Sequence, residues 1–420
     1  MKKLSTILLL AAAVIPLRAQ DSVTTLAGQA LVSGAANGTG TNAAFSDPAA
    51  IVADAHGNFF VADSQNHAIR KVTTNGVVTT FAGSLGVAGT SDGTGTGARF
   101  NSPCGLAFDG SGNLFVSDTG NSTIRKITPA GAVSTFAGSA GQSGFADGAA
   151  GSAQFSSPLG IVVAPNGNVY VADCGNHCLR AISGGVVSTF AGRPQVWGTA
   201  DGRGTNAQFD GPIGLAFDSH TNLFVSDANN DTIRIIAPDR SVTTFAGVAN
   251  EDGAADGDLN SARFRSPAEM AFDPKGNLFI ADSFNQTIRE ITTNGVVSTV
   301  SGMTAIDGSV DGENGVARFY NPYGVVVAAD GSLLIADTYN ELVRQVLVPF
   351  RLALQISGAT QVTTISWDSV VGKKYQVQVK SDLSVSWTNL ASILTATNLT
   401  LSAPDASAGR SRYYRVLRLN

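Results

Sequence analysis

Short apolar runs separated by glycine-rich turns follow one another along most of the chain. In one stretch the runs are Gly105–Phe108, Leu114–Ser117, Thr123–Ile127 and Val133–Phe136, with Asp, Gly, Asn and Pro between them. Runs of four or five residues bounded by such turn residues predict β-strands joined by hairpins. The apolar residues within a run are often consecutive, which favours strands that are buried on both faces of a sheet.

This pattern recurs six times, with a spacing of 54 or 55 residues. Each copy begins at a Phe, and the six are Phe45, Phe100, Phe155, Phe209, Phe264 and Phe319. An Asp follows at a fixed distance, as Asp63, Asp118, Asp173, Asp227, Asp282 and Asp337. An Asn comes three residues later, and then an Arg, as Arg70, Arg125, Arg180, Arg234, Arg289 and Arg344. Four short strands per copy, repeated radially, predict an all-β, six-bladed β-propeller.

One fourth-strand segment lies before the first copy, and the sixth copy has none after it. The early segment is Val23–Ala27, and the last predicted strand contains Val343 and Val346. We therefore expect Val23–Ala27 to pair with that strand and to close the last blade. Closure removes the free sheet edges, which otherwise promote aggregation.

The consensus Gly-Asn-Leu-Phe-Val-x-Asp-x-x-Asn-x-x-Ile-Arg resembles the NHL-repeat family. The segments Asn66-His67-Ala68-Ile69-Arg70 and Asn176-His177-Cys178-Leu179-Arg180 carry the resemblance best, and it covers about residues 23–346. The resemblance implies a six-bladed propeller of the secreted bacterial type. Relatives of that kind include secreted binding proteins, metal-dependent lactonases and an amidating lyase, so the resemblance leaves the activity open.

The two ends of the chain differ from the repeats. Residues 1–19 combine Lys2 and Lys3 with an apolar stretch too short to span a membrane, which predicts a secretory signal peptide and export to the periplasm, the cell surface or the medium. The propeller is expected over residues 20–347. Residues 348–420 alternate apolar and polar positions in about six short strands, which predicts a small β-sandwich. Its Ile365-Ser366-Trp367 and Tyr413-Tyr414-Arg415-Val416 segments resemble fibronectin-III-like modules.

Composition narrows the function classes. Charged residues make up 14% of the chain and the formal net charge is −5, or −8 without the signal peptide. These values exclude a coiled coil and do not suit a nucleic-acid-binding protein, which needs a basic surface. The protein is expected to be a monomer without a membrane span.

The Asp, Asn and Arg of the repeat occur once per blade, whereas a catalytic group is needed once per site, so we interpret them as structural. The four His residues do not converge in the sequence pattern, and no metal site is predicted from them. Asp256-Gly257-Asp258 has the first step of a calcium loop without its later ligands. We favour a turn there and leave a calcium ion open.

Residues unique to one blade are the better functional candidates, because shared residues build the propeller. These are Trp197, Glu269, Tyr320 and Tyr323, all expected on the face of the long loops near the channel mouth. Glu269 can serve as a ligand or general base, or it can be a solvated acid beside Arg263 or Arg265. We expect a surface that binds a protein, a peptide or a glycan and that carries no catalytic residue. The alternative is a metal-dependent lactonase-like or lyase-like site in the channel.

Cysteine usage gives one further expectation. Cys174 and Cys178 flank a predicted hairpin turn, and export permits a disulfide between them. Cys104 would then remain unpaired near the start of an inner strand.

Overall fold

The computed structural model describes residues 17–18, 22–313, 315–348, 351–356, 363–369, 373–380, 386, 388–405 and 413–419. Contacts divide the chain into two units, of which one is Asp21–Val348 and the other is Pro349–Asn420 together with Met1–Gln20. The described residues form β-strands and single turns of 3-10 helix, and no helix among them is long and apolar enough to cross a membrane.

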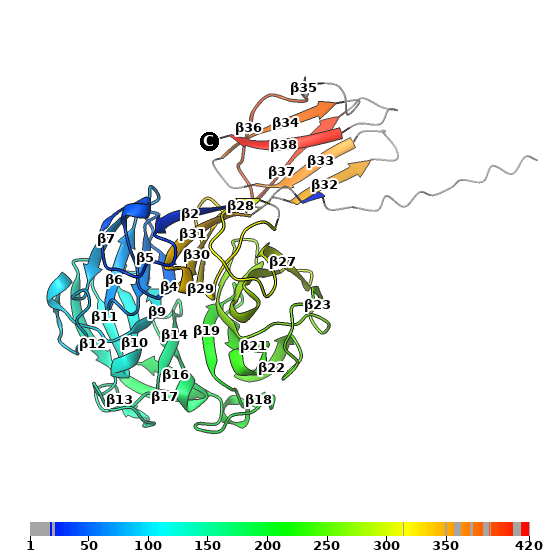
Figure 1. Cartoon of the computed structure of the whole chain (residues 1–420). Helices are drawn as coiled ribbons and strands as arrows, with labels where there is room; N and C mark the ends of the chain where they lie inside the picture. Colours follow the sequence, from blue (N-terminus) through cyan, green and yellow to red (C-terminus); the bar gives the residue numbers. More distant parts are fainter. Residues whose placement is uncertain are drawn as a thin grey trace, which may run out of the picture. The chain divides into compact units, whose positions relative to one another are not determined.

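The first unit is a ring of six antiparallel sheets around a central channel (Figure 1), which confirms the predicted six-bladed propeller. One strand of each sheet lies innermost and contacts the innermost strands of the two neighbouring blades. In order around the ring these strands are β4 (Pro48–Ala53), β9 (Pro103–Phe108), β14 (Pro158–Val163), β19 (Pro212–Phe217), β24 (Pro267–Phe272) and β29 (Pro322–Val327).

Three further strands follow outward in each blade. The second strands are β5 (Phe59–Asp63), β10 (Leu114–Asp118), β15 (Val169–Asp173), β20 (Leu223–Asp227), β25 (Leu278–Asp282) and β30 (Leu333–Asp337). The third strands are β6 (Ala68–Val72), β11 (Thr123–Ile127), β16 (Cys178–Ser183), β21 (Thr232–Ile236), β26 (Thr287–Ile291) and β31 (Leu342–Leu347). The fourth strands are β7 (Val77–Ala82), β12 (Ala132–Ala137), β17 (Val186–Ala191), β22 (Ser241–Ala246), β27 (Val296–Gly302) and β2 (Ser22–Gly28).

Each blade also has a fifth, outermost strand of two residues, where the sequence predicted only four. These strands are β3 (Gly38–Thr39), β8 (Gly93–Thr94), β13 (Gly148–Ala149), β18 (Gly202–Arg203), β23 (Gly257–Asp258) and β28 (Gly312–Glu313). They lie in the long loops that join one blade to the next. Two residues are too few to give a periodic pattern, which is why the sequence analysis missed them.

Single 3-10 turns complete the blades. Those between second and third strands are η3 (Thr119–Asn121), η4 (Cys174–Asn176), η6 (Ala228–Asn230), η7 (Ser283–Asn285) and η8 (Thr338–Asn340). Those in the long loops are η1 (Gly40–Asn42), η2 (Gly95–Gly97) and η5 (Gly204–Asn206). We call the side of the ring that carries the long loops and the turns between second and third strands the loop face.

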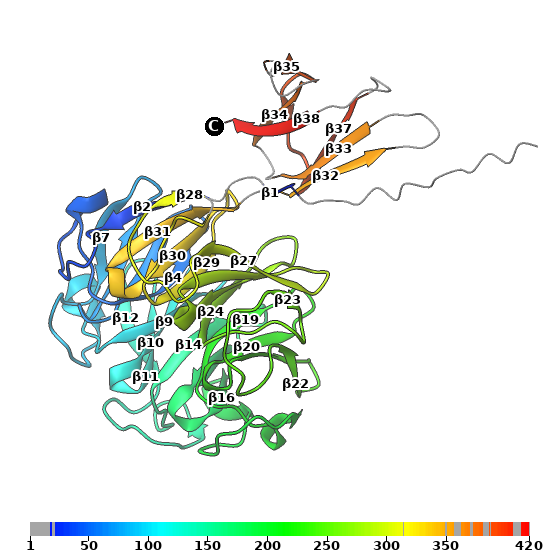
Figure 2. The same cartoon turned by 45° about the vertical axis from the view of Figure 1, so that its right-hand side comes forward.

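The N-terminal strand closes the ring as expected. β2 pairs antiparallel with β31, with Val23 opposite Val346 and Ala27 opposite Val343. Figure 2 shows β2 between β31 and the short β28. Val23 is fully buried and packs in one cluster with Phe319. The sixth blade is therefore built from both ends of the propeller sequence.

A buried Arg joins the hairpin of each blade to its long loop. In the third blade, Arg180 Nη1 donates to Asp173 Oδ2 at 2.7 Å, and Asn176 Nδ2 donates to the same oxygen at 2.8 Å. Arg180 Nη2 donates to Asp147 Oδ1 in the long loop at 2.6 Å. The Arg180 and Asp173 side chains are fully buried. We call this four-residue network the Arg latch.

The Arg latch recurs in the other five blades with one substitution. Where Asp147 stands, four blades have Asp92, Asp201, Asp256 or Asp311, and each accepts a hydrogen bond from its Arg. The first blade has Asn37, whose Oδ1 accepts from Arg70 Nη2 at 2.9 Å. Each guanidinium also lies over the ring of the Phe that opens its repeat, at 5.1–5.4 Å in all six blades.

A second set of hydrogen bonds joins neighbouring blades. The residue that ends the turn between second and third strands has a positive φ, and in five of the six blades its side chain accepts from a backbone N–H of the next blade. His177 Nδ1 accepts from Gly211 at 3.2 Å, and Glu341 Oε2 of the sixth blade accepts from Asp47 of the first at 2.6 Å. His67, Asp231 and Gln286 make the equivalent contact. Where this bond forms, the variable signature position supplies an acceptor that need not be a histidine.

The predicted disulfide between Cys174 and Cys178 is wrong. The structure has Cys104, Cys174 and Cys178 as free thiols. Cys178 is the first residue of β16, and its cross-strand partner is Asp173. Cys174 comes one position later in the turn η4, so the two cysteines are not opposite each other across the hairpin.

The second unit contains two small sheets. One has the order β1 (Leu17–Arg18), β32 (Arg351–Ile356), β33 (Thr363–Asp368), β37 (Thr400–Asp405). The other is built on β34 (Lys374–Lys380), which pairs with β35 (Thr388–Asn389), β36 (Leu394–Thr395) and β38 (Tyr413–Leu419). Trp367 and Tyr375, one from each sheet, share one buried cluster, so the two sheets pack face to face. Apart from β1, the predicted signal peptide lies outside the described residues.

Removing one Arg latch should destabilise the propeller strongly. Arg180→Met leaves the Asp173 carboxylate buried without its cation, and breaking a buried pair costs about 3–5 kcal/mol. Asn37→Asp instead gives Arg70 a second carboxylate partner, as the arginines of the other blades have. Because residue 37 is exposed, the new ion pair should raise the free energy of unfolding by at most about 1 kcal/mol.

Urea unfolding measures both effects, with Arg193→Met at an exposed loop position as the control. The Arg180→Met midpoint should fall well below that of the control, whereas the Asn37→Asp midpoint should equal or exceed that of the wild type. An Arg180→Met midpoint equal to the control would show that the latch contributes no stability.

Candidate functional site

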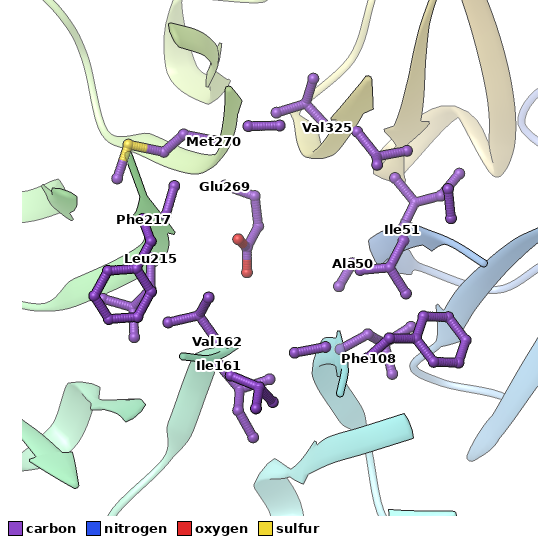
Figure 3. A pocket seen from close by; sticks show the side chains of 18 residues that line it. Ala50, Ile51, Phe108, Ile161, Val162, Leu215, Phe217, Glu269, Met270 and Val325 are labelled. Atoms are coloured by element: carbon purple, nitrogen blue, oxygen red, sulfur yellow. The ribbon is translucent and has the colours of Figure 1, made fainter. Parts of the chain in front are cut away.

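The inner strands line a partly open cavity of about 310 Å³ on the ring axis. Apart from Glu269, the side chains that line it are apolar and include Phe108, Ile161, Phe217 and Met270 from four different blades. Among the lining residues, Glu269 of β24 carries the single ionisable side chain, and Figure 3 shows its carboxyl group projecting into the space between the apolar side chains.

Glu269 occupies a position where the packing of the ring favours glycine. The equivalent residues are Ala50, Gly105, Gly160, Gly214 and Gly324. A Cβ atom at Gly160 would lie 2.0 Å from the Ile213 carbonyl oxygen, and one at Gly324 would lie 2.3 Å from the Ala49 carbonyl oxygen. Neighbouring inner strands therefore approach each other closely in this layer. A glutamate there is not explained by packing of the blades.

The Glu269 carboxyl group has no hydrogen bond or ion pair with any residue that the structure describes. Arg263 pairs with Glu251 at 2.7 Å and Arg265 with Asp252 at 3.2 Å, so neither arginine serves Glu269. Burial among apolar groups raises the pKa of Glu269 to about 8. The carboxyl group is therefore mostly protonated at neutral pH.

Two further titratable side chains lie beside Glu269. Cys104 Sγ of β9 contacts the Tyr323 hydroxyl of β29 at 3.7 Å, past the small Ala49 of the blade between them. Burial raises the pKa of the Cys104 thiol to about 12, and burial followed by the neighbouring Cys104 raises the pKa of Tyr323 well above its ordinary value. Each stands two residues before the first cavity-lining residue of its strand, Leu106 or Val325, on the side of the loop face. They are neutral hydrogen-bonding groups at physiological pH.

The four sequence candidates thus fall into separate environments. Glu269 and Tyr323 face the channel and come close together with Cys104. Tyr320 lies in the long loop before β29, where its ring packs edge-to-face on Tyr339 at 5.1 Å. Trp197 lies in the loop after the third blade, is 69% exposed and forms a backbone bridge with Phe209.

The structure adds a set of exposed apolar side chains on adjoining turns and loops that the sequence analysis missed. Phe284 and Tyr339 are 52% and 47% exposed on the turns of the fifth and sixth blades. The other blades have Gln65, Gly120, Gly175 and Asn229 at this position. Leu31, Val32, Met303 and Ile306, also exposed, lie in the adjoining loops. We call Leu31, Val32, Phe284, Met303, Ile306 and Tyr339 the apolar sector.

Backbone hydrogen bonds tie the parts of the apolar sector together. The Ala305 N–H donates to Asn285 O, beside Phe284, and the Leu31 N–H donates to Asn340 O, beside Tyr339. Ser283 Oγ of the fifth blade donates to Pro322 O of the sixth at 2.6 Å. Comparing the six copies position by position would have found Phe284 and Tyr339, by the same rule that selected Glu269.

The described residues form neither a cluster of metal ligands nor a calcium-binding loop. No group of three or more His, Cys, Asp and Glu side chains converges among them. In the suspected calcium segment, Asp256 accepts from Arg289 at 2.8 Å, and Asp258 accepts from the Ser261 N–H at 2.8 Å. These carboxylates are committed to the Arg latch and to a local turn.

Glu269→Gln should change how stability depends on pH. The ordinary pKa of a Glu is 4.5, and that of Glu269 in the folded protein is about 8. Between these values the folded protein retains a proton that the unfolded chain has released, so wild-type stability falls as the pH rises and levels off above about pH 8. A Gln at this position is neutral at every pH, so the variant does not lose this stability as the pH rises.

The two proteins should melt at similar temperatures at pH 5, and the variant should melt higher by a few degrees at pH 8.5. Glu313→Gln, at an exposed loop position, is the matched control and should follow the wild type at both pH values. A melting difference between Glu269→Gln and wild type that stays constant from pH 5 to 8.5 would mean that Glu269 titrates normally.

Comparison with known proteins agrees with the repeat pattern. The NHL-repeat family model matches residues 155–182. The chain is 28% identical over 275 residues to "Protein SUPPRESSOR OF QUENCHING 1, chloroplastic" of Arabidopsis thaliana, covering 61% of this chain and 26% of that protein. It is 26% identical over 266 residues to human "NHL repeat-containing protein 2", covering 55% of this chain and 37% of that protein. It spans well under half the length of these relatives.

Two solved structures from Bacteroides thetaiotaomicron share the fold. A protein described as of unknown function is 21% identical with a TM-score of 0.61, over 79% of this chain and 76% of that one. An "auxiliary nutrient binding protein" is 15% identical with a TM-score of 0.59, over the same shares of the two chains. At these identities the likeness establishes the fold alone. The protein is thus a six-bladed propeller that carries an NHL repeat.

Proposed function

We propose that the protein is an exported binding protein whose apolar sector captures a protein or peptide partner. The observation that carries the proposal is the exposure of Phe284 and Tyr339 at a position where the other four blades have polar residues or glycine. Large aromatic side chains supply much of the binding energy of protein interfaces. Contiguous exposed apolar groups on a soluble protein mark interaction surfaces.

The contacts that hold the turns of the apolar sector in place favour a binding surface that is already formed before the partner arrives. The turns that present Phe284 and Tyr339 are held by the Arg latches of Arg289 and Arg344. The Tyr320 ring braces Tyr339 from the adjacent loop. A rigid surface loses little conformational entropy on association, which raises affinity for a given set of contacts.

Catalysis is the less favoured function. Metal-dependent lactonase-like or lyase-like chemistry needs several convergent ligands, and the described residues of the channel wall offer one carboxyl group, Glu269. A propeller of the same fold is described as an auxiliary nutrient binding protein, and this description fits a binding role. Neither argument identifies the partner.

Selection from a displayed library of random 12-residue peptides tests the proposal. Wild-type protein should enrich a peptide family that the double variant Phe284→Ala/Tyr339→Ala binds at least about tenfold more weakly, because two central aromatic contacts are lost. The control is His220→Ala, since His220 is exposed on a turn between first and second strands, on the opposite face. If the enriched peptides bound the double variant and the wild type equally, the sector would not be the binding surface.

Export is part of the same proposal, supported by residues 1–19 of the sequence. The full chain produced in a bacterium with a general secretion pathway should appear outside the cytoplasm, with a new N-terminus after Ala19. Leu8→Arg/Leu9→Arg should block this export, because charges interrupt the apolar region of the signal. Recovery of the wild-type chain in the cytoplasm with residues 1–19 intact would contradict it.

A further inference from the structure

The channel cavity is a second site, separate from the apolar sector. It is a partly open cavity of about 310 Å³, which is at the lower end of the ~300–1,000 Å³ typical of small-molecule pockets. Such pockets are mostly apolar with a few polar groups that fix the orientation of the ligand. The cavity has this character, with one carboxyl group aimed into it (Figure 3).

A purely structural role does not account for Glu269. The ring favours glycine at this position, because a Cβ atom in four of the other blades would lie 2.0–2.4 Å from a neighbouring carbonyl oxygen. Glu269 also makes no hydrogen bond or ion pair with the described residues that surround it. A residue that opposes the local packing rule and has no partner of its own is expected at a functional position.

One carboxyl group among apolar side chains indicates which class of ligand would fit the cavity. A carboxylate in an apolar enclosure is unfavourable alone and favourable beside a cation. One carboxyl group does not supply the several oxygen ligands that a divalent metal ion requires. An organic ammonium ion is satisfied by a single counter-ion, and its hydrocarbon part would contact the apolar wall formed by residues such as Phe108, Phe217 and Met270.

We propose that the channel binds a small apolar amine in its ammonium form, with the Glu269 carboxylate as counter-ion. The hydrocarbon part of the amine lies among the inner strands, on the side of Glu269 away from Tyr323 and Cys104. This site goes beyond the capture of a partner at the apolar sector and does not depend on it.

Binding of the amine is coupled to loss of a proton. The titratable groups that face Glu269 are Cys104 from β9 and Tyr323 from β29, and both have raised pKa values that keep them neutral near pH 7. In the free protein Glu269 is mostly protonated at that pH, because its pKa is about 8. The bound ammonium ion stabilises the Glu269 carboxylate, so Glu269 releases its proton to the solvent. The amine stays protonated throughout.

Calorimetric titration of the full chain with n-hexylamine at pH 7, in two buffers of different ionisation enthalpy, measures this coupling. Wild-type protein should bind the amine and release nearly one proton per amine bound. Glu269→Gln should bind at least about tenfold more weakly and release no proton, because a neutral amide cannot act as counter-ion. Glu313→Gln should behave as the wild type.

1-Hexanol separates charge recognition from filling of an apolar cavity, because it lacks the ammonium group. The wild type should bind it at least about tenfold more weakly than the amine. Three outcomes would overturn the proposal: no hexylamine binding by the wild type, equal binding by Glu269→Gln, or equal affinity for hexanol. Phe284→Ala/Tyr339→Ala should retain amine binding, so failure of this site and failure of the apolar sector are distinguishable.

Discussion

The buried arginine of each blade sets the conditions that the rest of the propeller must meet. A guanidinium group removed from water is stable only where its charge is paired and most of its donors are satisfied. In the third blade, Asp173 comes from the hairpin, Asp147 from the long loop, and Phe155 lies under the cation. The long loop therefore cannot leave its blade without exposing a buried charge pair. This is why segments so rich in glycine are held in defined positions.

Hydrogen bonds and close backbone contacts also join neighbouring blades. Residues with a positive φ, such as Glu341, accept a side-chain hydrogen bond from the backbone of the following blade. The inner strands also contact one another at Gly160 and Gly324, where there is no room for a side chain. The loop face is a fixed frame on which blades five and six display Phe284 and Tyr339. Phe284 and Tyr339 depart from the repeat at positions that contact solvent, and Glu269 departs from it at a position that contacts the channel.

The repeat made most of the fold predictable, because six copies of one pattern reveal which residues the blades share. It also gave the closure by Val23–Ala27, since one fourth strand was displaced to the N-terminus. The pairing of Asp256 with Arg289 was not predictable, because their contact depends on how a loop folds back over its blade. The expected disulfide failed for a similar reason: the register that opposes Cys178 to Asp173 is set by the turn. Glu269 stood out by position, whereas its isolation from any partner required the structure.

Closure of the ring by β2 has a consequence for the order in which the chain is made. β2 ends at Gly28, and its partner β31 begins only at Leu342. At about 5–20 residues per second, a ribosome adds the intervening chain in roughly 15–60 s. For that time β2 has been made but its partner strand has not. Any factor that shields this strand until β31 is available would protect the one blade whose strands come from both ends of the propeller sequence.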